Sequence, residues 1–240
     1  MIEDLLTQLK LFGALEFFNE SYDDKMSSLN LLEGMLAREQ QRRSFNALKK
    51  RLSMAKFPYV REWSEIDSKR NGKIPFNKIK KFSNGEFIEK NSNLCFIGTP
   101  GLGKTHCLVS IGRDLCRLGM RVAFYTACDL VNQLEEAKNN FEITKLMDKL
   151  LKPQLLIIDE LGFVPFSDNG ARLLFDVFSK RYEKGSIAVS TNLSFEKWSQ
   201  IFGSIELTTA LIDRFTHNCE IYTFQGTSIR LEDSKKRKKR

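Results

Sequence analysis

The chain has 240 residues, of which 42% are hydrophobic and 28% charged, a composition that is ordinary for a soluble globular protein. No apolar run approaches the ~18 residues of a membrane span, and the acidic start of the chain is unlike a secretory signal peptide. We therefore expect a cytoplasmic protein with no membrane partner. Its five cysteines fall inside expected strands and helices without a C-x-x-C pair, so we expect reduced, mostly buried thiols and no metal site built from them.

The net charge of +8 is distributed unevenly along the chain. Residues 1–90 carry 17 basic and 13 acidic side chains, residues 91–234 carry 15 and 17, and residues 235–240 are all basic. A near-neutral middle between two basic flanks favours a polyanionic partner, and nucleic acid is the first candidate. A solubilising tail and a solvated helix face are the alternative interpretation.

Two helices are expected in the first 56 residues of the chain. Apolar residues recur at steps of three and four over residues 2–19, which predicts one amphipathic helix that ends at a break over residues 21–25. A second helix is expected over residues 28–54, with an apolar first part and a basic later part. Since short helices with one apolar face must bury it against each other, residues 1–56 should form a small all-helical domain. Its role stays open between docking a protein partner, contacting DNA and structural packing.

The periodic pattern weakens over residues 57–90, which we interpret as a basic linker and lead-in to the core. This segment contains a basic cluster that no acidic residue interrupts: Lys69, Arg70, Lys73, Lys78, Lys80 and Lys81. The cluster either touches nucleic acid or is simply solvated.

Strands and helices alternate from residue 91 onwards. Expected strands cover residues 94–97, 122–126, 154–159, 187–190 and 220–224, and expected helices cover residues 104–118, 128–138, 142–151, 169–183 and 206–215. Such alternation predicts an α/β domain over residues 91–230, with a parallel sheet and helices on both of its faces. Residues 231–240 then form a basic tail.

A phosphate-binding loop is expected between the first strand and the first helix of this domain. Residues 98–105 read Gly-x-x-x-x-Gly-Lys-Thr, with the members Gly98, Thr99, Pro100, Gly101, Leu102, Gly103, Lys104 and Thr105. The glycines let the loop curl with positive φ and turn backbone N–H groups toward the β- and γ-phosphates, to which the following helix adds the positive end of its dipole. Lys104 supplies an ammonium charge and Thr105 a hydroxyl for Mg²⁺, so the motif predicts a nucleoside triphosphate site.

Polar side chains follow two further strands at the same edge of the predicted sheet. Asp159 and Glu160 end a fully apolar strand, whose carboxyl end would open on the phosphate crevice. Asp159 would hold Mg²⁺ through water, and Glu160 would orient and deprotonate the attacking water. The two carboxylates therefore predict that the protein hydrolyses the bound nucleotide. Asn192 follows the next strand, where its amide either reaches the γ-phosphate or the attacking water, or is simply a turn residue.

Together these motifs resemble the AAA+ ATPases of the P-loop class, and among them the subgroup of IstB-type transposition helpers and DnaC-type helicase loaders. The resemblance rests on residues 98–106, 156–162, 190–198 and 210–215, and it extends over about residues 57–230. The histidine directly after Gly-Lys-Thr and the Ser-Thr-Asn-Leu stretch with its following tryptophan favour the IstB type.

The resemblance also implies roles for individual residues. Lys104 and Thr105 would belong to Walker A together with His106, Asp159 and Glu160 would form Walker B, and Asn192 would be the sensor-1 residue. Arg214 would be an arginine finger that acts on the nucleotide of a neighbouring subunit. Arg230 matches the sensor-2 arginine, although the chain has Ser-Ile-Arg where the family tends to have Ser-Tyr-Arg. A C-terminal helical lid is not expected, so a neighbouring subunit would close much of the site.

The implied function is an ATP-dependent helper of an insertion-sequence transposase. It would bind ATP and Mg²⁺, assemble as a homo-oligomer with composite sites on double-stranded DNA, hydrolyse ATP and regulate transposition. A replicative helicase loader, with a helicase as partner, is the first alternative. A nucleotide-gated DNA scaffold with negligible turnover is the second, and Glu160 argues against it. Cleavage of DNA by this chain is not expected, because no further acidic cluster offers a two-metal site.

Overall fold

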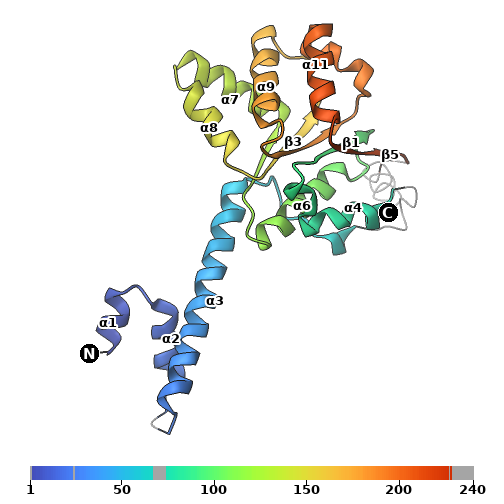
Figure 1. The fold of residues 1–240 in the computed structure, drawn as a ribbon. Coiled ribbons are helices and arrows are strands. Elements are labelled where there is room, and N and C mark those ends of the chain that lie inside the picture. Colours follow the sequence, from blue (N-terminus) through green and yellow to red (C-terminus); the bar gives the residue numbers. More distant parts are fainter. Residues whose placement is uncertain (1, 24, 67–73, 227, 229–240) are drawn as a thin grey trace, which may run out of the picture. The chain divides into compact units, whose positions relative to one another are not determined.

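The computed structural model describes residues 2–23, 25–66, 74–226 and 228, and the chain divides into two compact units, residues 1–51 and 52–240 (Figure 1). The expected division into residues 1–56, 57–90, 91–230 and 231–240 stays a prediction. Within the described residues, no helix has the length and apolar character needed to cross a membrane.

The first unit contains α1 (Ile2–Gln8), α2 (Phe12–Ser21) and most of α3 (Ser28–Ala55). The single helix expected over residues 2–19 is wrong, because the chain breaks before α2 and Lys10 takes a left-handed φ of 56°. The break lets Gly13 approach α3 so closely that a Cβ there would lie 2.8 Å from the Arg38 carbonyl oxygen. A tertiary contact therefore overrides the helical periodicity at this point.

A buried carboxylate secures the start of α2 in place of a local capping residue. Glu39 of α3 is 6% exposed and accepts hydrogen bonds from the backbone N–H groups of Gly13 at 2.7 Å and Ala14 at 3.4 Å. Burial opposes ionisation of this carboxyl, but the hydrogen bonds from Arg43, Gly13 and Ala14 outweigh it and lower the pKa of Glu39. Other arginines of α3 also have partners inside the unit, since Arg38 and Arg42 form ion pairs with glutamates of α2.

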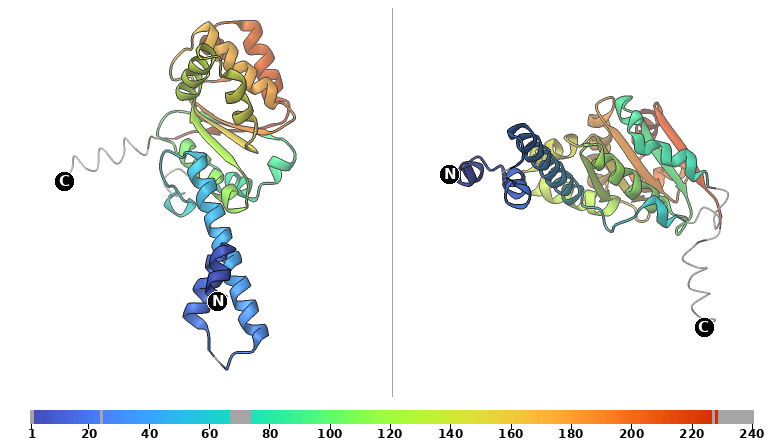
Figure 2. Two further views of the ribbon diagram at one scale, coloured as in Figure 1. Left: turned by 90° about the vertical axis from the view of Figure 1, so that its left-hand side faces the viewer. Right: turned by 90° about the horizontal axis from the view of Figure 1, so that it is seen from below.

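The second unit is organised around five strands: β1 (Asn93–Gly98), β2 (Val122–Thr126), β3 (Leu155–Leu161), β4 (Ser186–Thr191) and β5 (Cys219–Phe224). The strands lie side by side in one sheet (Figure 2). All strand pairs are parallel, and the order is β2-β3-β4-β1-β5. The apolar residues 155–158 of β3 are fully buried, as expected for a strand covered on both faces. The predicted parallel α/β sheet is therefore confirmed.

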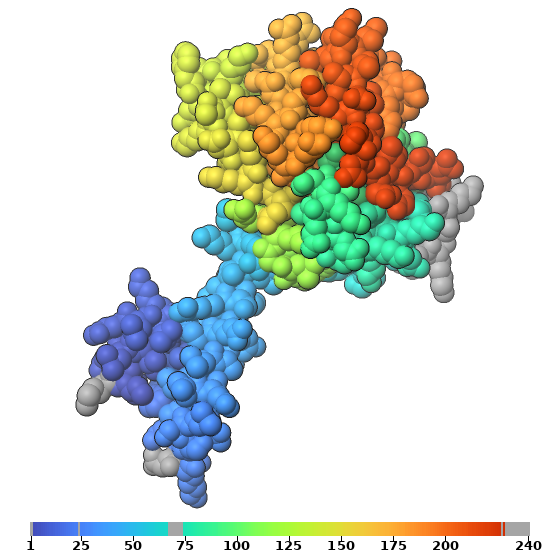
Figure 3. Space-filling model, in the orientation of Figure 1, coloured from blue at the N-terminus to red at the C-terminus, as the bar shows by residue number. Residues whose placement is uncertain are grey.

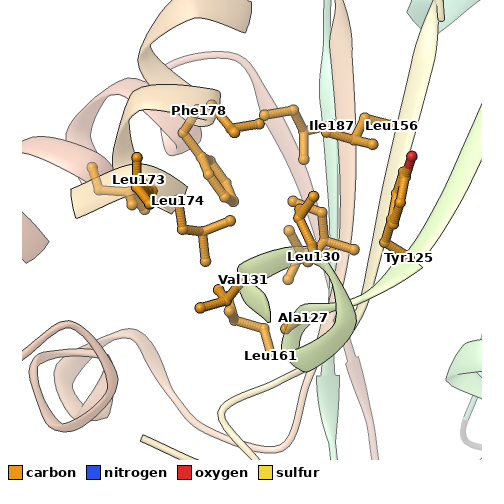
Figure 4. Packing of buried hydrophobic residues seen from close by; sticks show 14 of the residues in the cluster. Tyr125, Ala127, Leu130, Val131, Leu156, Leu161, Leu173, Leu174, Phe178 and Ile187 are labelled. Carbon is orange, nitrogen blue, oxygen red and sulfur yellow. The ribbon is translucent and has the colours of Figure 1, made fainter. Parts of the chain in front are cut away.

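Helices cover both faces of this sheet. One face carries α6 (Lys104–Arg117), and the other carries α7 (Ala127–Asn139), α8 (Ile143–Leu151), α9 (Asp168–Arg181) and α11 (Ile205–Thr216), as Figure 1 shows. In the core, Leu130 of α7 and Phe178 of α9 pack toward Leu156 and Ile187 of the sheet (Figure 4). The orange α9 and red α11 lie side by side (Figure 3). Between them, the rings of Phe178 and Phe215 meet edge to face, with 5.5 Å between the ring centres.

Shorter elements complete the second unit. After β4 the chain forms η3 (Phe195–Lys197) and α10 (Ser199–Phe202), and before β1 it forms η1 (Trp63–Glu65), α4 (Phe76–Lys80), η2 (Lys81–Asn84) and α5 (Glu86–Glu89).

The segment expected as a linker packs onto the core in its described part. Phe76 and Phe87 are buried, and the Trp63 indole N–H donates to Asp114 of α6 at 2.8 Å. The described part of this stretch thus packs as a lead-in to the core, and its apolar residues are spread over helices too short to give a periodic pattern. Of the basic cluster, Lys78, Lys80 and Lys81 are exposed, while Lys69, Arg70 and Lys73 lie outside the described residues.

Candidate functional site

A cleft of about 310 Å³ opens at the carboxyl ends of the strands of the second unit. Residues from four parts of the chain line it: Tyr59, Arg61, Pro100, Gly101, Gly103, Lys104, Thr105, His106, Glu160, Phe163 and Ser190. The phosphate loop and the second carboxylate of the β3 motif therefore meet in one cavity. This convergence matches the rule that ligands of open α/β sheets bind beyond the carboxyl ends of the strands.

The loop between β1 and α6 has the backbone that its sequence predicts. Gly98 has a φ of 154°, and a Cβ there would lie 2.4 Å from the Phe224 carbonyl oxygen, so only glycine fits against β5. Gly103 has a φ of 91° and directly precedes α6. Leu102 is 1% exposed and anchors the loop in the core. The loop can thus present backbone N–H groups and the amino end of α6 to an anion.

Backbone carbonyl groups of the phosphate loop hold the Lys104 side chain over the loop. The ammonium group donates to the Gly98 carbonyl at 2.5 Å and to the Thr99 carbonyl at 3.0 Å, and the residue is only 7% exposed. A partly desolvated ammonium in this position attracts a phosphate strongly.

Asp159 lies deep in the site, with 3% of its surface exposed. Its Oδ1 accepts hydrogen bonds from the Thr105 hydroxyl at 3.1 Å and from the Ser190 hydroxyl. Burial raises the pKa of Asp159, against the opposing effect of these hydrogen bonds. A carboxylate whose charge is costly when buried is well suited to bind a cation, because the cation would restore the lost solvation.

Glu160 occupies a strained position at the end of β3. It has a left-handed φ of 61°, which is uncommon for any residue with a Cβ, and the pairing of β3 with β4 shifts register between Ile158 and Leu161. Its backbone N–H donates to Ser190 Oγ at 3.1 Å. The irregular backbone turns the exposed Glu160 side chain toward the cleft, where a base or water-orienting group is needed.

Asn192, the expected sensor, is placed differently from the residues just described. It is exposed, and among the described residues those lining the cleft include Ser190 and not Asn192. Sequence reasoning missed Ser190. Its hydroxyl lies near the carboxyl end of a buried strand, as Asp159 does, and this position was an available signal. Tyr59, Arg61 and Phe163 were also missed.

Arg214 lies at the opposite end of the sheet from the cleft. It lines a second hollow, of about 290 Å³, together with Asn93 and Gly185 at the amino ends of β1 and β4. Its guanidinium donates to Ser179 Oγ at 3.0 Å and lies 5.2 Å from the centre of the Phe175 ring. The length of β1, on the order of 15–20 Å, separates this hollow from the phosphate loop of the same chain. Arg230 lies outside the described residues.

A comparison with known protein families shows to which family this chain belongs. A family model described as IstB-like ATP binding protein matches residues 5–237. The chain belongs to this family. The putative ATP-binding protein of insertion sequence IS5376 from Geobacillus stearothermophilus is 35% identical over 217 residues, which cover 90% of this chain and 84% of that protein. The putative ATP-binding protein of insertion sequence IS21 from Pseudomonas aeruginosa is 30% identical over 240 residues, which cover 98% and 90%.

A solved structure confirms the fold of this IstB-like chain. The crystal structure of the DnaC helicase loader matches with a TM-score of 0.52 and 22% identity, and it covers 76% of this chain and 99% of that one. The expected fold is thereby confirmed, and the family model confirms the expected resemblance to the IstB type.

The donor set of the IstB-like site fits a magnesium ion that arrives with a nucleotide. The Thr105 hydroxyl and the Asp159 carboxylate offer oxygen donors, which Mg²⁺ prefers. Across residues 2–66 and 74–226, apart from the undescribed Asp24, no three His, Cys, Asp or Glu side chains cluster closely enough to hold a metal by themselves. Mg²⁺ commonly uses one or two carboxylates together with substrate phosphates, so the residues present are sufficient.

Proposed function

We propose that this protein is the ATP-hydrolysing helper of an insertion-sequence transposase, and that it assembles on double-stranded DNA to regulate transposition. The observation that carries the proposal is the convergence of Lys104, Thr105 and Glu160 in one cleft, with Asp159 beneath them. Membership of the IstB-like ATP-binding family and the insertion-sequence relatives at 30% and 35% identity support it.

The residues of the cleft divide the chemistry among them. Lys104 and the loop N–H groups bind the β- and γ-phosphates, and His106 borders the nucleotide at the first turn of α6. Thr105 and Asp159 hold Mg²⁺, which supplies neutralisation of phosphate charge when it is bound. Glu160 accepts a proton from the attacking water and orients it. Asn192 follows β4 outside the residues that line the cleft, and its proposed role is a further polar contact to the nucleotide or the attacking water.

Arg214 serves the site of a neighbouring subunit. Its place at the amino ends of β1 and β4 supports this assignment, because the same chain's phosphate loop lies at the other end of the sheet. A homo-oligomer that stacks one end of the sheet against the other would bring the guanidinium to the γ-phosphate of the next subunit. There it would stabilise the charge that develops on the transferred phosphoryl group.

The basic surfaces bind the DNA backbone. Lys78, Lys80 and Lys81 are exposed on α4 and η2, and residues 235–240 add a basic tail that lies outside the described residues. Contacts of this kind are made to phosphates, so binding should depend steeply on salt and little on sequence. The transposase is the favoured partner because the relatives with 30% and 35% identity are named for insertion sequences, whereas the likeness to the DnaC helicase loader is a likeness of fold.

ATP hydrolysis and ATP binding, measured separately on DNA, test this function. Lys104→Ala should lose ATP binding, whereas Glu160→Gln should keep it and lose about 10²–10⁴-fold in hydrolysis rate, because only the group that activates water is neutralised. Glu136→Gln, which changes an exposed carboxylate of α7, should behave like the parent.

Two results would contradict the assignment. Hydrolysis by Glu160→Gln at the parental rate would remove Glu160 from the mechanism. Tight ATP binding by the parent without any turnover on DNA would instead favour the nucleotide-gated scaffold.

A further inference from the structure

The segment that leads from α3 to η1 forms one wall of the nucleotide cleft and is fixed firmly to α6. The Phe57 ring meets Phe124 edge to face at 6.2 Å, and it lies so close to α6 that a Cβ on Gly112 would come within 2.8 Å of it. Pro58 follows and restricts the backbone directly before Tyr59. The position of Tyr59 is thus set by an aromatic anchor and a rigid residue.

Glu62 fixes the other side of the same segment. Its Oε1 accepts hydrogen bonds from Arg113 Nη2 at 2.9 Å and from Arg117 Nη2 at 2.6 Å, both on α6. Its backbone carbonyl lies 2.9 Å from Nε2 of His106, the residue that directly follows Thr105. The segment between Phe57 and Glu62 therefore borders the cleft at the first turn of α6, next to the phosphate loop.

Between these two anchors, Tyr59 and Arg61 form a stacked pair that faces the cleft. The Arg61 guanidinium lies 5.0 Å from the centre of the Tyr59 ring, and Glu65 holds it with an ion pair of 3.0 Å. Both residues line the cleft, and Tyr59 keeps 37% of its surface exposed. A ring that is held in place and partly exposed offers a flat surface for another π system.

The charged groups of the cleft account for the phosphates of a nucleotide but not for its base. Among the described residues, three aromatic rings line the cavity: Tyr59, Phe163 and the imidazole of His106. His106 directly follows Thr105 at the phosphate loop and its Nε2 lies 2.9 Å from the Glu62 carbonyl, so this ring is at the phosphate end of the cleft. Phe163 belongs to the turn that its own N–H closes on the Glu160 carbonyl at 3.4 Å, so it lies beside the group that acts on the terminal phosphate. The base is at the other end of a nucleoside triphosphate, which leaves Tyr59 as its partner.

We propose that Tyr59 is the platform on which the base of the bound nucleoside triphosphate stacks, and that Arg61 is the residue that positions this ring. The inference rests on the proposed function, since it concerns the same cleft. Stacking uses the π face that every base possesses, so Tyr59 contributes affinity for any nucleoside triphosphate without selecting adenine over guanine.

Calorimetric binding of ATP and of inorganic tripolyphosphate, each with Mg²⁺, tests the proposal, because only ATP carries a base. Tyr59→Ala should weaken ATP binding by about 5–150-fold, the range typical of one lost base–aromatic stack. Its affinity for tripolyphosphate should stay within about 2-fold of the parent. Tyr59→Phe keeps the ring and should bind both compounds like the parent. Tyr59→Leu keeps apolar bulk without a π face and should repeat the loss, which provides a second variant if the alanine protein folds poorly.

The possible failures are distinguishable from one another. If the parent binds neither compound, the proposed nucleotide site itself is wrong, and the stacking platform falls with it. If the parent binds ATP and the alanine and leucine variants keep that affinity, the platform alone is wrong. An equal loss for ATP and tripolyphosphate would also overturn it, because Tyr59 would then act on the phosphates or on the loop. A selective loss of ATP binding in Phe163→Ala, with Tyr59→Ala unchanged, would assign the base to Phe163.

Discussion

The Thr105 hydroxyl donates a hydrogen bond of 3.1 Å to Asp159 Oδ1, and this bond joins the first helix after the phosphate loop to the end of β3. Ser190 of β4 donates to the same oxygen. Three chain segments far apart in sequence therefore meet at one buried carboxylate, which is where a metal with its nucleotide would be held.

Asp159→Asn should stabilise the protein while it removes hydrolysis. Because burial raises the pKa of Asp159 in the folded state, the stability linked to this group is present below its unfolded pKa and is lost as pH rises through the folded pKa. At pH 7 an amide avoids that cost, and we expect a gain of about 0.5–2 kcal/mol in the free energy of unfolding. Urea denaturation at pH 7 measures it, and the gain should shrink toward about pH 4.

Asp176→Asn is the matched control, since Asp176 is an exposed aspartate on α9, and it should change the unfolding free energy by less than about 0.5 kcal/mol. A loss of stability in Asp159→Asn would show that the carboxylate strengthens the fold more than its burial weakens it.

Glu39→Gln should loosen the start of α2 within the first unit. The charged carboxylate accepts two backbone N–H groups there, and its pKa is lowered because hydrogen bonds from Arg43, Gly13 and Ala14 outweigh the effect of burial. We expect a local loss of about 1 kcal/mol, as for other helix caps, visible as faster hydrogen exchange at Gly13 and Ala14. Glu33→Gln, an exposed position on the same helix, should leave this exchange unchanged. Unchanged exchange in Glu39→Gln would mean that packing of Gly13 against α3 alone holds the helix.

The core of the second unit was predictable because its signals are local. Residues 155–158 are a continuous apolar run that ends in two carboxylates, and the phosphate loop is a motif of eight adjacent residues. Each element could therefore be recognised from a short stretch, and alternation along the chain then determined the parallel sheet.

The errors arose where distant residues decide the structure. The break before α2 depends on Glu39 and Arg38 of another helix, and the wall of the cleft depends on Glu62 meeting Arg113, 51 positions later. Neither contact leaves a periodic pattern. The pairing of β3 with β4 likewise shifts register next to Asp159, and Ser190 of β4, not Asn192, bonds to Asp159 and lines the cleft.

Glu62→Gln should destabilise the second unit in a pH-dependent way. The hydrogen bond from Arg117 lowers the pKa of Glu62, burial opposes this shift, and Arg113 adds to it. A lowered pKa means stability that is present above the unfolded pKa, near about 4.3, and lost as pH falls through the folded value. We therefore expect a loss of about 1 kcal/mol at pH 7, limited because the partners are partly exposed, and no difference from the parent well below pH ~4.

Thermal unfolding over this pH range measures the effect of Glu62. Glu89→Gln, at an exposed position at the end of α5, serves as the control. A destabilisation that is the same at every pH would show that the shape of the side chain matters and its charge does not.

A mixing experiment on DNA tests whether Arg214 of a neighbouring subunit completes the ATP site, as we propose. Arg214→Ala subunits should bind ATP and hydrolyse it poorly, whereas Lys104→Ala subunits should not bind ATP but still offer Arg214. Neither protein alone should be active. Mixed together they should regain hydrolysis, because an arginine finger is worth about 10³–10⁵ in rate and a minority of correct interfaces would rise above background. If the mixture stays as inactive as its components while light scattering shows that mixed oligomers form on DNA, the composite site proposed here is contradicted.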